Sequence, residues 1–404
     1  MTPARTAAVA LAATLAIQIY AAFAATAPAV LAPEIARTFG VEARWIGAFV
    51  GLVYAGGMFA SLASGGFIER HGSIRVSQAC VVLCALGVAG IALAPAHAIA
   101  LLAAAAVVIG LGYGPITPAS SQLLQRTAPP ARMALTFSIK QTGVPAGAAL
   151  SGALLPALAL ATGWRSAFAI AALAGLAIVA TAQPIRAGLD ADRDPKGRVS
   201  AAGIIAPLSL LRESRALRDL ALVSFAYSAT QVCLTSFLVV YLTETLHFSL
   251  VAAGLALTSA TLGGVAGRIG WGYVADRWLR PRVVLATIGF CAAACGALTA
   301  VATSAWPPPA IATLAALFGA TAIGWNGVQL SEVARLAPPG SAGKVTGATG
   351  FVTFAGVVIG PPSFALLASL TGSYRVGFAT FAALSTGMAL LLIRRRDGAR
   401  KPAS

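Results

Sequence analysis

Long apolar runs separated by short polar segments make up most of this sequence. Seven runs lack Asp, Glu, Lys and Arg and have the length of one membrane-crossing helix: 6–33, 45–68, 166–185, 220–243, 245–267, 345–374 and 376–393. Two longer runs, 76–125 and 283–331, each contain a proline turn and predict two helices apiece. The run 133–164, interrupted only by Lys140, predicts one more. The pattern therefore predicts an all-α membrane protein with twelve transmembrane helices.

Composition supports this class. The chain has 404 residues, of which 58% are hydrophobic and 10% charged, whereas about 25% of residues are charged in soluble proteins. A soluble protein of this size would expose much of that apolar surface to water, and a bilayer accepts it freely. A water-soluble globule is excluded.

The positive charge has a topological explanation. The chain carries 28 Lys and Arg against 12 Asp and Glu, but the basic residues lie between apolar runs and form no basic helix face, so we expect no nucleic-acid partner. Most fall on one side if the N-terminus is inside, the exceptions being Arg37, Arg44, Arg165 and Arg375. We therefore expect both termini in the cytoplasm and the first run to be a retained helix rather than a cleaved signal peptide.

The chain divides into two similar halves. We predict a six-helix bundle over 1–185, a cytoplasmic linker over 186–219 and a second six-helix bundle with a basic tail over 220–404. Ala128-Pro129-Pro130 recurs as Ala337-Pro338-Pro339 in the second half. A duplicated six-helix unit is typical of transporters whose substrate site lies near the membrane midplane, between the repeats.

The loop after the second predicted helix carries a motif in both halves. The first copy contains Gly65, Glu69, Arg70 and Gly72, and the second contains Gly272, Asp276 and Arg277. These residues resemble the loop motif of the major facilitator superfamily, roughly G-x-L-x-D-R-x-G-R-[KR]. The first copy departs from it with Glu for Asp and with Ser73 and Ile74 where basic residues are usual.

This resemblance covers essentially the whole chain. It implies two parallel six-helix repeats, alternating access, a working monomer and a gating role for the motif residues. A carboxylate near helix ends can pair across the inner gap when the gate is shut and release when it opens, which is the role we predict for Glu69 and Asp276. Alternatively, the motif arginines only anchor the topology.

Lys140 is the strongest candidate for contact with a substrate. It is the only ionisable residue that the run pattern places well inside a span, about 12 Å along the helix from Arg132, and such a residue indicates a functional site. We predict that Lys140 holds an anionic substrate, with Gln141 beside it. Alternatively, its long side chain reaches back to the inner interface.

Other polar residues lie at mid-helix depth. They are Gln18, Tyr20, Tyr227, Gln231, Asn326 and Gln329. The resemblance implies that the first, fourth, seventh and tenth helices line the cavity, so we predict substrate contacts for all six, although each could instead join two helices by a hydrogen bond. Glu332 is a candidate proton carrier, but a local pair with Arg335 would also explain it.

We predict a secondary active transporter for a small solute, an organic anion such as a carboxylate. The alternative is a proton-coupled exporter of drugs or amphiphiles, against which Ala106 counts because that exporter class is expected to carry an arginine there. A ligand sensor that transports nothing would have the same pattern. No Gly-x-x-x-x-Gly-Lys loop is present, which excludes an ATP-driven pump within this chain.

We predict no enzyme, bound cofactor or metal site. The histidines His71, His97 and His247 lie at helix ends without a buried acid–base partner, and the five cysteines fall inside apolar runs. The expected partners are the small-molecule substrate, membrane lipid and either a coupling proton or a counter-anion. The Ala-rich, Arg-over-Lys composition is typical of a high-GC bacterium, so we expect the inner membrane.

Overall fold

A computed structural model describes residues 2–41, 46–196 and 201–394, without the side chains of 201–204. Arg44, Arg198 and the basic residues of 395–401, on which part of the topology prediction rests, lie outside the described residues.

The described residues are almost all helical. The first half contains α1 (Pro3–Val30), α2 (Ala32–Phe39), α3 (Ile46–His71), α4 (Ser73–Leu93), α5 (Ile99–Tyr113), α6 (Ile116–Thr127), η2 (Pro130–Arg132), α7 (Met133–Gln141), α8 (Gly143–Thr162) and α9 (Trp164–Leu189). The linker contains α10 (Ala201–Glu213). The second half contains α11 (Arg215–Val240), η3 (Tyr241–Thr245), α12 (Leu250–Arg277), α13 (Pro281–Val301), α14 (Pro308–Ala322), α15 (Asn326–Leu336), α16 (Ala342–Thr371) and α17 (Tyr374–Arg394).

These elements confirm the predicted all-α fold class. Within the described residues, 12 helical segments are long and apolar enough to cross a membrane. Four spans are built from two or more elements each: α5 with α6, η2 and α7 with α8, α11 with η3, and α14 with α15. The predicted proline turns separate α4 from α5 and α13 from α14.

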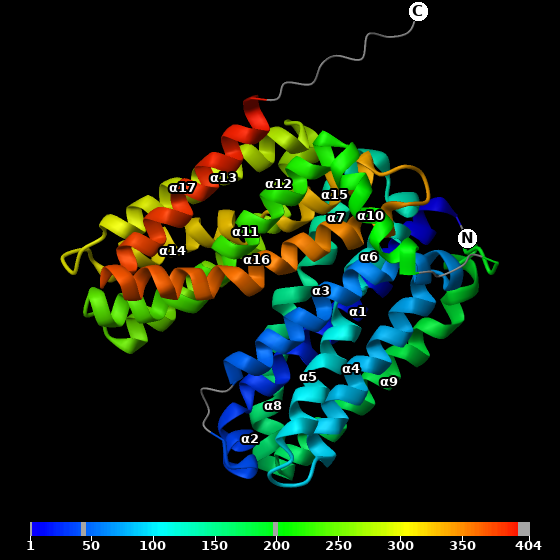
Figure 1. The fold of residues 1–404 in the computed structure, drawn as a ribbon, viewed down its shortest axis with the longest axis horizontal. Helices are drawn as coiled ribbons and strands as arrows, with labels where there is room; N and C mark the ends of the chain where they lie inside the picture. The colour runs from blue at the N-terminus through cyan, green and yellow to red at the C-terminus, as the bar shows by residue number, and fades with distance from the viewer. Residues whose placement is uncertain (1, 42–45, 197–200, 395–404) are drawn as a thin grey trace, which may run out of the picture.

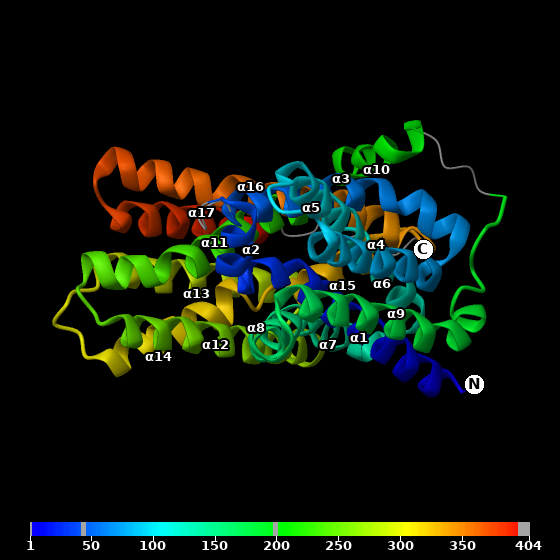
Figure 2. The same cartoon turned by 90° about the horizontal axis from the view of Figure 1, so that it is seen from below.

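The helices form two bundles that meet at one end (Figure 1). One bundle contains α1–α9 and the other α11–α17, and they converge at the end that carries the linker helix α10 and diverge at the opposite end. Across the convergence α3 packs on α16, and α7 packs on α12 and α15. We call this end the linker end. A view from below shows α10 at the same end (Figure 2).

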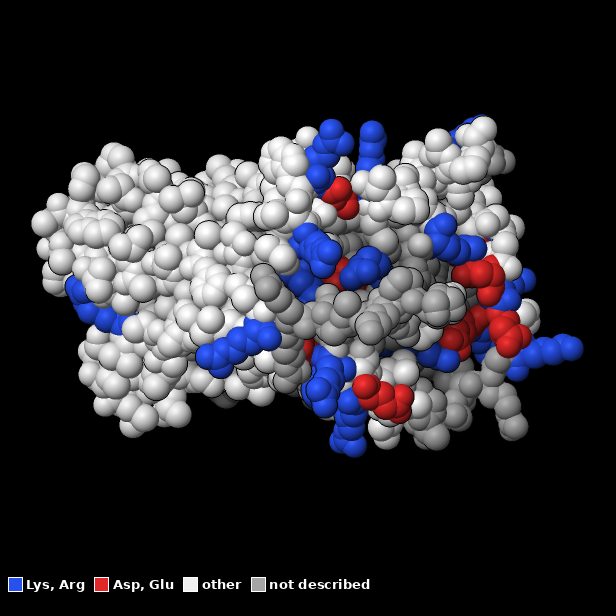
Figure 3. Space-filling view, turned by 90° about the horizontal axis from the view of Figure 1, so that it is seen from above, with Lys and Arg blue, Asp and Glu red and all other residues white. Residues whose placement is uncertain are grey.

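Charge is segregated along the long axis. In the view from above, Lys, Arg, Asp and Glu gather toward the linker end, and the opposite part of that face is nearly free of them (Figure 3). A charged end beside an apolar wall is the arrangement expected of a membrane-embedded protein.

The helices extend beyond the predicted boundaries. The predicted division at 186–219 falls inside helical structure, because α9 continues to Leu189 and α11 begins at Arg215. The prediction also ended the eighth span at residue 267, whereas α12 continues to Arg277. The prediction ended each span at the first charged residue, whereas a helix can continue past a charged residue into the polar region.

Candidate functional site

A polar pocket lies between the two bundles. Its volume is about 140 Å³, and its lining comes from α3, α5, α6, α7 and α8 on one side and α11, α12, α15 and α16 on the other. No Asp, Glu or Lys belongs to this lining, and its one charged residue is Arg268. Both halves therefore share one site near the middle of the spans.

Broken helices build the pocket. α6 begins at Ile116 after Gly114-Pro115, and α15 begins at Asn326 after the break at 323–325. Residues of both first turns, including Thr117 and Gln329, line the pocket. The interruptions are slight, because Pro115 and Trp325 keep helical backbone angles and Ala119 N and Gln329 N still donate to the carbonyls of these residues. These turns therefore place polar side chains around the pocket.

Arg268 corrects the sequence analysis, in which the run 245–267 ended just before it and Lys140 was the only ionisable residue well inside a span. The structure places Arg268 nine residues before the end of α12 with 2% of its surface exposed. Its Nε donates to the Ile323 carbonyl at 3.1 Å, and its Nη1 donates to the Gln141 carbonyl in the other bundle. A comparison of the two halves could have revealed this position. Arg268 lies about four residues before Gly272, just as Ser61, which is inside the run 45–68, lies before Gly65.

Lys140 lies just behind the pocket lining with 1% of its surface exposed. Its Nζ donates to Gln18 Oε1 at 2.6 Å, to Gln141 Oε1 at 3.1 Å and to Thr117 Oγ1 at 3.4 Å. Among the described residues its recorded partners are thus neutral, and no carboxylate cancels its charge. The alternative of a lysine stretched to the inner interface does not fit this burial.

The structure brings four of the predicted polar residues to the pocket lining: Gln141, Gln231, Asn326 and Gln329. Gln231 Oε1 accepts from Trp325 Nε1 at 3.2 Å and from Asn326 Nδ2 at 3.1 Å. The Nε2 of Gln329 and the Oγ1 of Thr346, also on the lining, are buried without a hydrogen-bond partner among the described residues. Unpaired buried donors are rare, and a bound ligand would satisfy them.

Tyr20 and Tyr227 lie outside this lining. The Tyr20 hydroxyl donates to the Ala171 carbonyl at 3.2 Å, and the Tyr227 hydroxyl donates to the Leu285 carbonyl at 2.9 Å. Each hydroxyl therefore joins two helices of its own bundle, the first bundle for Tyr20 and the second for Tyr227. A substrate role for either tyrosine stays a prediction.

The motif acids bridge the two bundles at the linker end. Glu69 Oε1 lies 2.6 Å from Lys344 Nζ on α16, and Gly65 packs on the same lysine. The Asp276 carboxylate accepts from the backbone N–H groups of Ala134 at 2.9 Å and Leu135 at 2.7 Å, in the first turn of α7. A carboxylate there is stabilised by the unpaired N–H groups and the helix dipole.

The remaining motif residues lie around these contacts. Gly272 packs on Ser138 of α7, whereas Arg70 and Arg277 are exposed at helix ends. Of the predicted gating residues, Glu69, Asp276, Gly65 and Gly272 therefore contact the opposite bundle.

Two glutamines, missed in the sequence, strengthen the same contact. Gln122 Nε2 donates to the Gly340 carbonyl at 2.8 Å while its Oε1 accepts from Gly343 N at 2.9 Å, and Gln125 Nε2 donates to the Ala334 carbonyl at 2.8 Å. They belong to α6 and their partners to the other bundle. Glu332 is buried and pairs with Arg335 at 2.6 Å, the local pair that was the alternative to a proton carrier.

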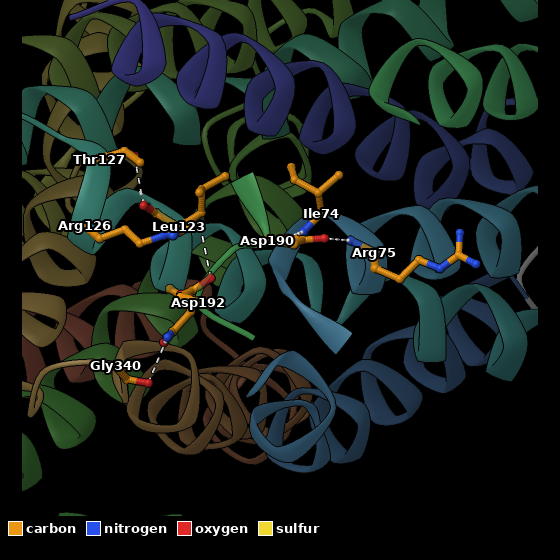
Figure 4. A network of polar contacts seen from close by, with 9 residues as sticks. Ile74, Arg75, Leu123, Arg126, Thr127, Asp190, Asp192 and Gly340 are labelled. Carbon is orange, nitrogen blue, oxygen red and sulfur yellow. Dashed lines mark hydrogen bonds and ion pairs between the residues drawn. The ribbon is translucent and has the colours of Figure 1, made fainter. Parts of the chain in front are cut away.

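The linker also holds the first motif loop (Figure 4). The Asp190 carboxylate accepts from the backbone N–H groups of Ile74 at 2.8 Å and Arg75 at 3.0 Å, and so caps α4. Gly72 precedes α4 with φ +92°, and a side chain there would overlap Asp190. Asp192 pairs with Arg126 at 3.2 Å. Asp190 therefore fixes the start of α4, and Asp192 joins the linker to α6.

These features define a class of protein. Two helical membrane bundles, joined at one end and sharing a polar pocket between broken helices, are the architecture of a membrane transporter.

Comparisons with known proteins identify the family. The family model described as Major Facilitator Superfamily matches residues 13–361 and, again, 220–404. This chain belongs to that superfamily, and membership points to transport rather than catalysis. No curated protein matches the sequence significantly.

Solved structures share the fold at low identity. The E. coli fucose:proton symporter superposes with a TM-score of 0.75 at 17% identity, covering 97% of this chain and 100% of that one. The human organic anion transporter MFSD10 gives 0.76 at 19% identity, with 97% and 100% covered. A bacterial homologue of the iron transporter ferroportin, in an outward-facing state, gives 0.75 at 15% identity, with 95% and 98% covered.

Proposed function

We propose that this protein is a secondary active transporter that moves a small organic anion, such as a carboxylate, by alternating access. The observation that carries the proposal is the pair of buried cations: Arg268 lines the pocket, Lys140 lies directly behind it, and the lining includes no carboxylate. Their recorded hydrogen-bond partners are neutral oxygens. An ionised guest would satisfy this charge.

Two further features favour an anion. Arg268 makes no recorded hydrogen bond through Nη2 within the described residues, which leaves that nitrogen for a bidentate carboxylate contact in which it joins Nη1. One of the similar structures is itself an organic anion transporter.

Pocket size separates this proposal from the drug-exporter alternative. Pockets that bind drug-sized ligands have volumes of about 300–1,000 Å³, whereas this pocket measures about 140 Å³. A short carboxylate therefore fits better than an amphiphilic drug. Without a carboxylate on the lining, the coupling partner is a counter-anion or a proton that the substrate itself brings.

The shape supports an outward-facing state. The bundles are bonded together at the linker end and diverge at the other. Because basic residues favour the cytoplasmic side, the proposal takes the linker end as cytoplasmic. The proposed setting is a bacterial inner membrane, with the chain acting as a monomer and with Glu69 and Asp276 as parts of the inner gate.

Thermal unfolding of the purified protein tests the proposal. Lactate, succinate or citrate should raise the midpoint of the wild type, because a ligand at about 100 times its Kd adds about 2.7 kcal/mol to folded-state stability. Lys140→Met and Arg268→Lys should lose this rise. Arg212→Gln, which removes an exposed charge on α10, should retain it.

The opposite pattern would favour another function. If tetraphenylphosphonium stabilises all variants and carboxylates stabilise none, the result would contradict an anion transporter and support an exporter of drugs or amphiphiles. Counterflow of the stabilising anion in proteoliposomes then separates a transporter from a sensor, since a sensor binds without flux.

A further inference from the structure

A second cavity lies away from the central pocket, on the outer side of the first bundle. It measures about 810 Å³ and runs between α3 and α4 toward α5 and α9. We call it the α3–α4 groove. Its walls are largely apolar, and Phe67 and Leu111 on those walls are 44% and 39% exposed. Because these helices are long and apolar enough to span a membrane, we infer that the groove faces lipid.

Basic groups mark the linker end of the groove. Arg75 and His71 both line it and both are exposed, and the His71 ring stacks on Phe67. No ion pair involves the Arg75 guanidinium within the described residues, and Figure 4 shows that side chain extending away from Asp190, which binds only its backbone N–H. The groove is thus an apolar slot with a positive rim.

A buried amide oxygen lies in the wall near this rim. Gln78 is 2% exposed and donates through Nε2 to the Val179 carbonyl and to Gln183 Oε1, both at 3.0 Å. Its Oε1 has no hydrogen-bond partner among the described residues. Gln78 follows Arg75 by three residues and shares its face of α4, about 4.5 Å deeper. A cation on the rim and an unpaired acceptor buried in the wall below it therefore lie within about one helical turn of each other on α4.

We propose that the α3–α4 groove is a binding site for an anionic phospholipid with a hydroxylated headgroup, of the phosphatidylglycerol type. The phosphate binds Arg75 with His71 beside it, a glycerol hydroxyl donates to Gln78 Oε1, and an acyl chain lies along the apolar walls. A zwitterionic lipid would place a second cation against this positive rim. A free fatty acid would leave the Gln78 oxygen without a donor once ionised.

Native mass spectrometry of delipidated protein tests this site. Phosphatidylglycerol and phosphatidylcholine with the same acyl chains, and oleate, are titrated separately. We expect tighter binding of phosphatidylglycerol to the wild type. Arg75→Gln should weaken it about five-fold, the effect of one arginine at an anionic headgroup.

Two further variants control for surface charge and folding. Arg280→Gln removes an exposed arginine at the start of α13, the counterpart of α4 in the second bundle, and should leave phosphatidylglycerol binding unchanged. Ala79→Phe fills the groove without altering charge and should weaken binding of the lipid.

Three results would overturn the proposal: equal binding of the two phospholipids, equal losses in Arg75→Gln and Arg280→Gln, or oleate binding as tightly as phosphatidylglycerol. None of these measurements involves transport, so the site stands or fails independently of the proposed substrate.

Discussion

At the scale of single residues, the structure separates polar side chains that are satisfied from those that are not. The hydroxyls of Tyr20 and Tyr227 each have a carbonyl partner on a neighbouring helix, whereas Gln329 Nε2 has none among the described residues. In a membrane, where the lipid core supplies no competing donor, a satisfied group holds helices together and an unsatisfied one awaits a ligand.

Replacing the tyrosines tests this distinction. Tyr20→Phe and Tyr227→Phe should each lower stability by about 0.6 kcal/mol, and at most about 1.7 kcal/mol, because one helix–helix hydrogen bond is lost. Carboxylate affinity should not change. Thermal unfolding with and without the anion measures both quantities, and a fall in affinity at unchanged stability would instead place the hydroxyls on the substrate.

Whether the sequence revealed a buried charged residue depended on the position of that residue within its apolar run. Lys140 stood out because uncharged residues flank it on both sides. Arg268 did not, because a charge near the end of a run resembles a boundary, and only the comparison with Ser61 in the other half places it mid-span. Gln122 and Gln125 could not be found, since their partners are carbonyl and N–H groups more than 200 residues away.

At the scale of elements, close helix crossings depend on glycine. α12 and α14 pack along their length, and a Cβ on Gly319 would overlap the backbone carbonyl of Ala260. Small residues at such crossings let backbones approach closely. This crossing has a counterpart between α3 and α5, where Gly110 lies against the Val53 carbonyl.

A matched pair of glycine substitutions isolates that effect. Gly319→Ala should cost about 1–3 kcal/mol, the usual range for overpacking, because a backbone carbonyl cannot move as a side chain can. Gly254→Ala on α12 meets nothing within 4 Å and should leave the midpoint unchanged or slightly higher. Thermal unfolding of both variants is the measurement, and equal midpoints would show that the crossing tolerates a methyl group.

Helix positions were easier to predict than helix interruptions. The outer turns were readable because Pro95 and the prolines at 307–309 cannot continue a helix. The break at Thr142 lies just before Pro145, which has no N–H to donate to the Gln141 carbonyl, and Arg268 donates to that carbonyl instead. The break before Asn326 has no proline, and there Arg268 Nε donates to the Ile323 carbonyl. The break before Asn326 is therefore the one that the sequence left undetermined.

At the scale of the whole molecule, the proposed alternating-access cycle requires the same sequence to support more than one arrangement of its bundles. The hydrophobic pattern fixes twelve helices in every state of the cycle, but it does not choose between a closed and an open linker end. Here the closed linker end combines a buried apolar cluster from both bundles with polar contacts: the Glu69–Lys344 ion pair, the Asp276 cap on α7 and the hydrogen bonds of two glutamines. A change in any of these contacts shifts the balance between a closed and an open linker end.

Weakening one of these contacts should therefore shift the population of states. Asp276→Asn removes the charge from the α7 N-terminus but keeps a hydrogen-bond acceptor, so the closed state should lose about 0.3–1 kcal/mol, and up to about 2 kcal/mol where the cap is partly buried. Spin labels at exposed Ala131 and Arg280, one in each bundle, with the exposed Cys291 changed to serine, report the separation at the linker end. Longer distances should gain several-fold in population in Asp276→Asn and in Glu69→Gln, whereas Glu213→Gln, an exposed acid on α10, should resemble the wild type. Identical distance distributions in both gate variants and the wild type would mean that the motif arginines only anchor topology and that the acids play no part in closing the inner gate.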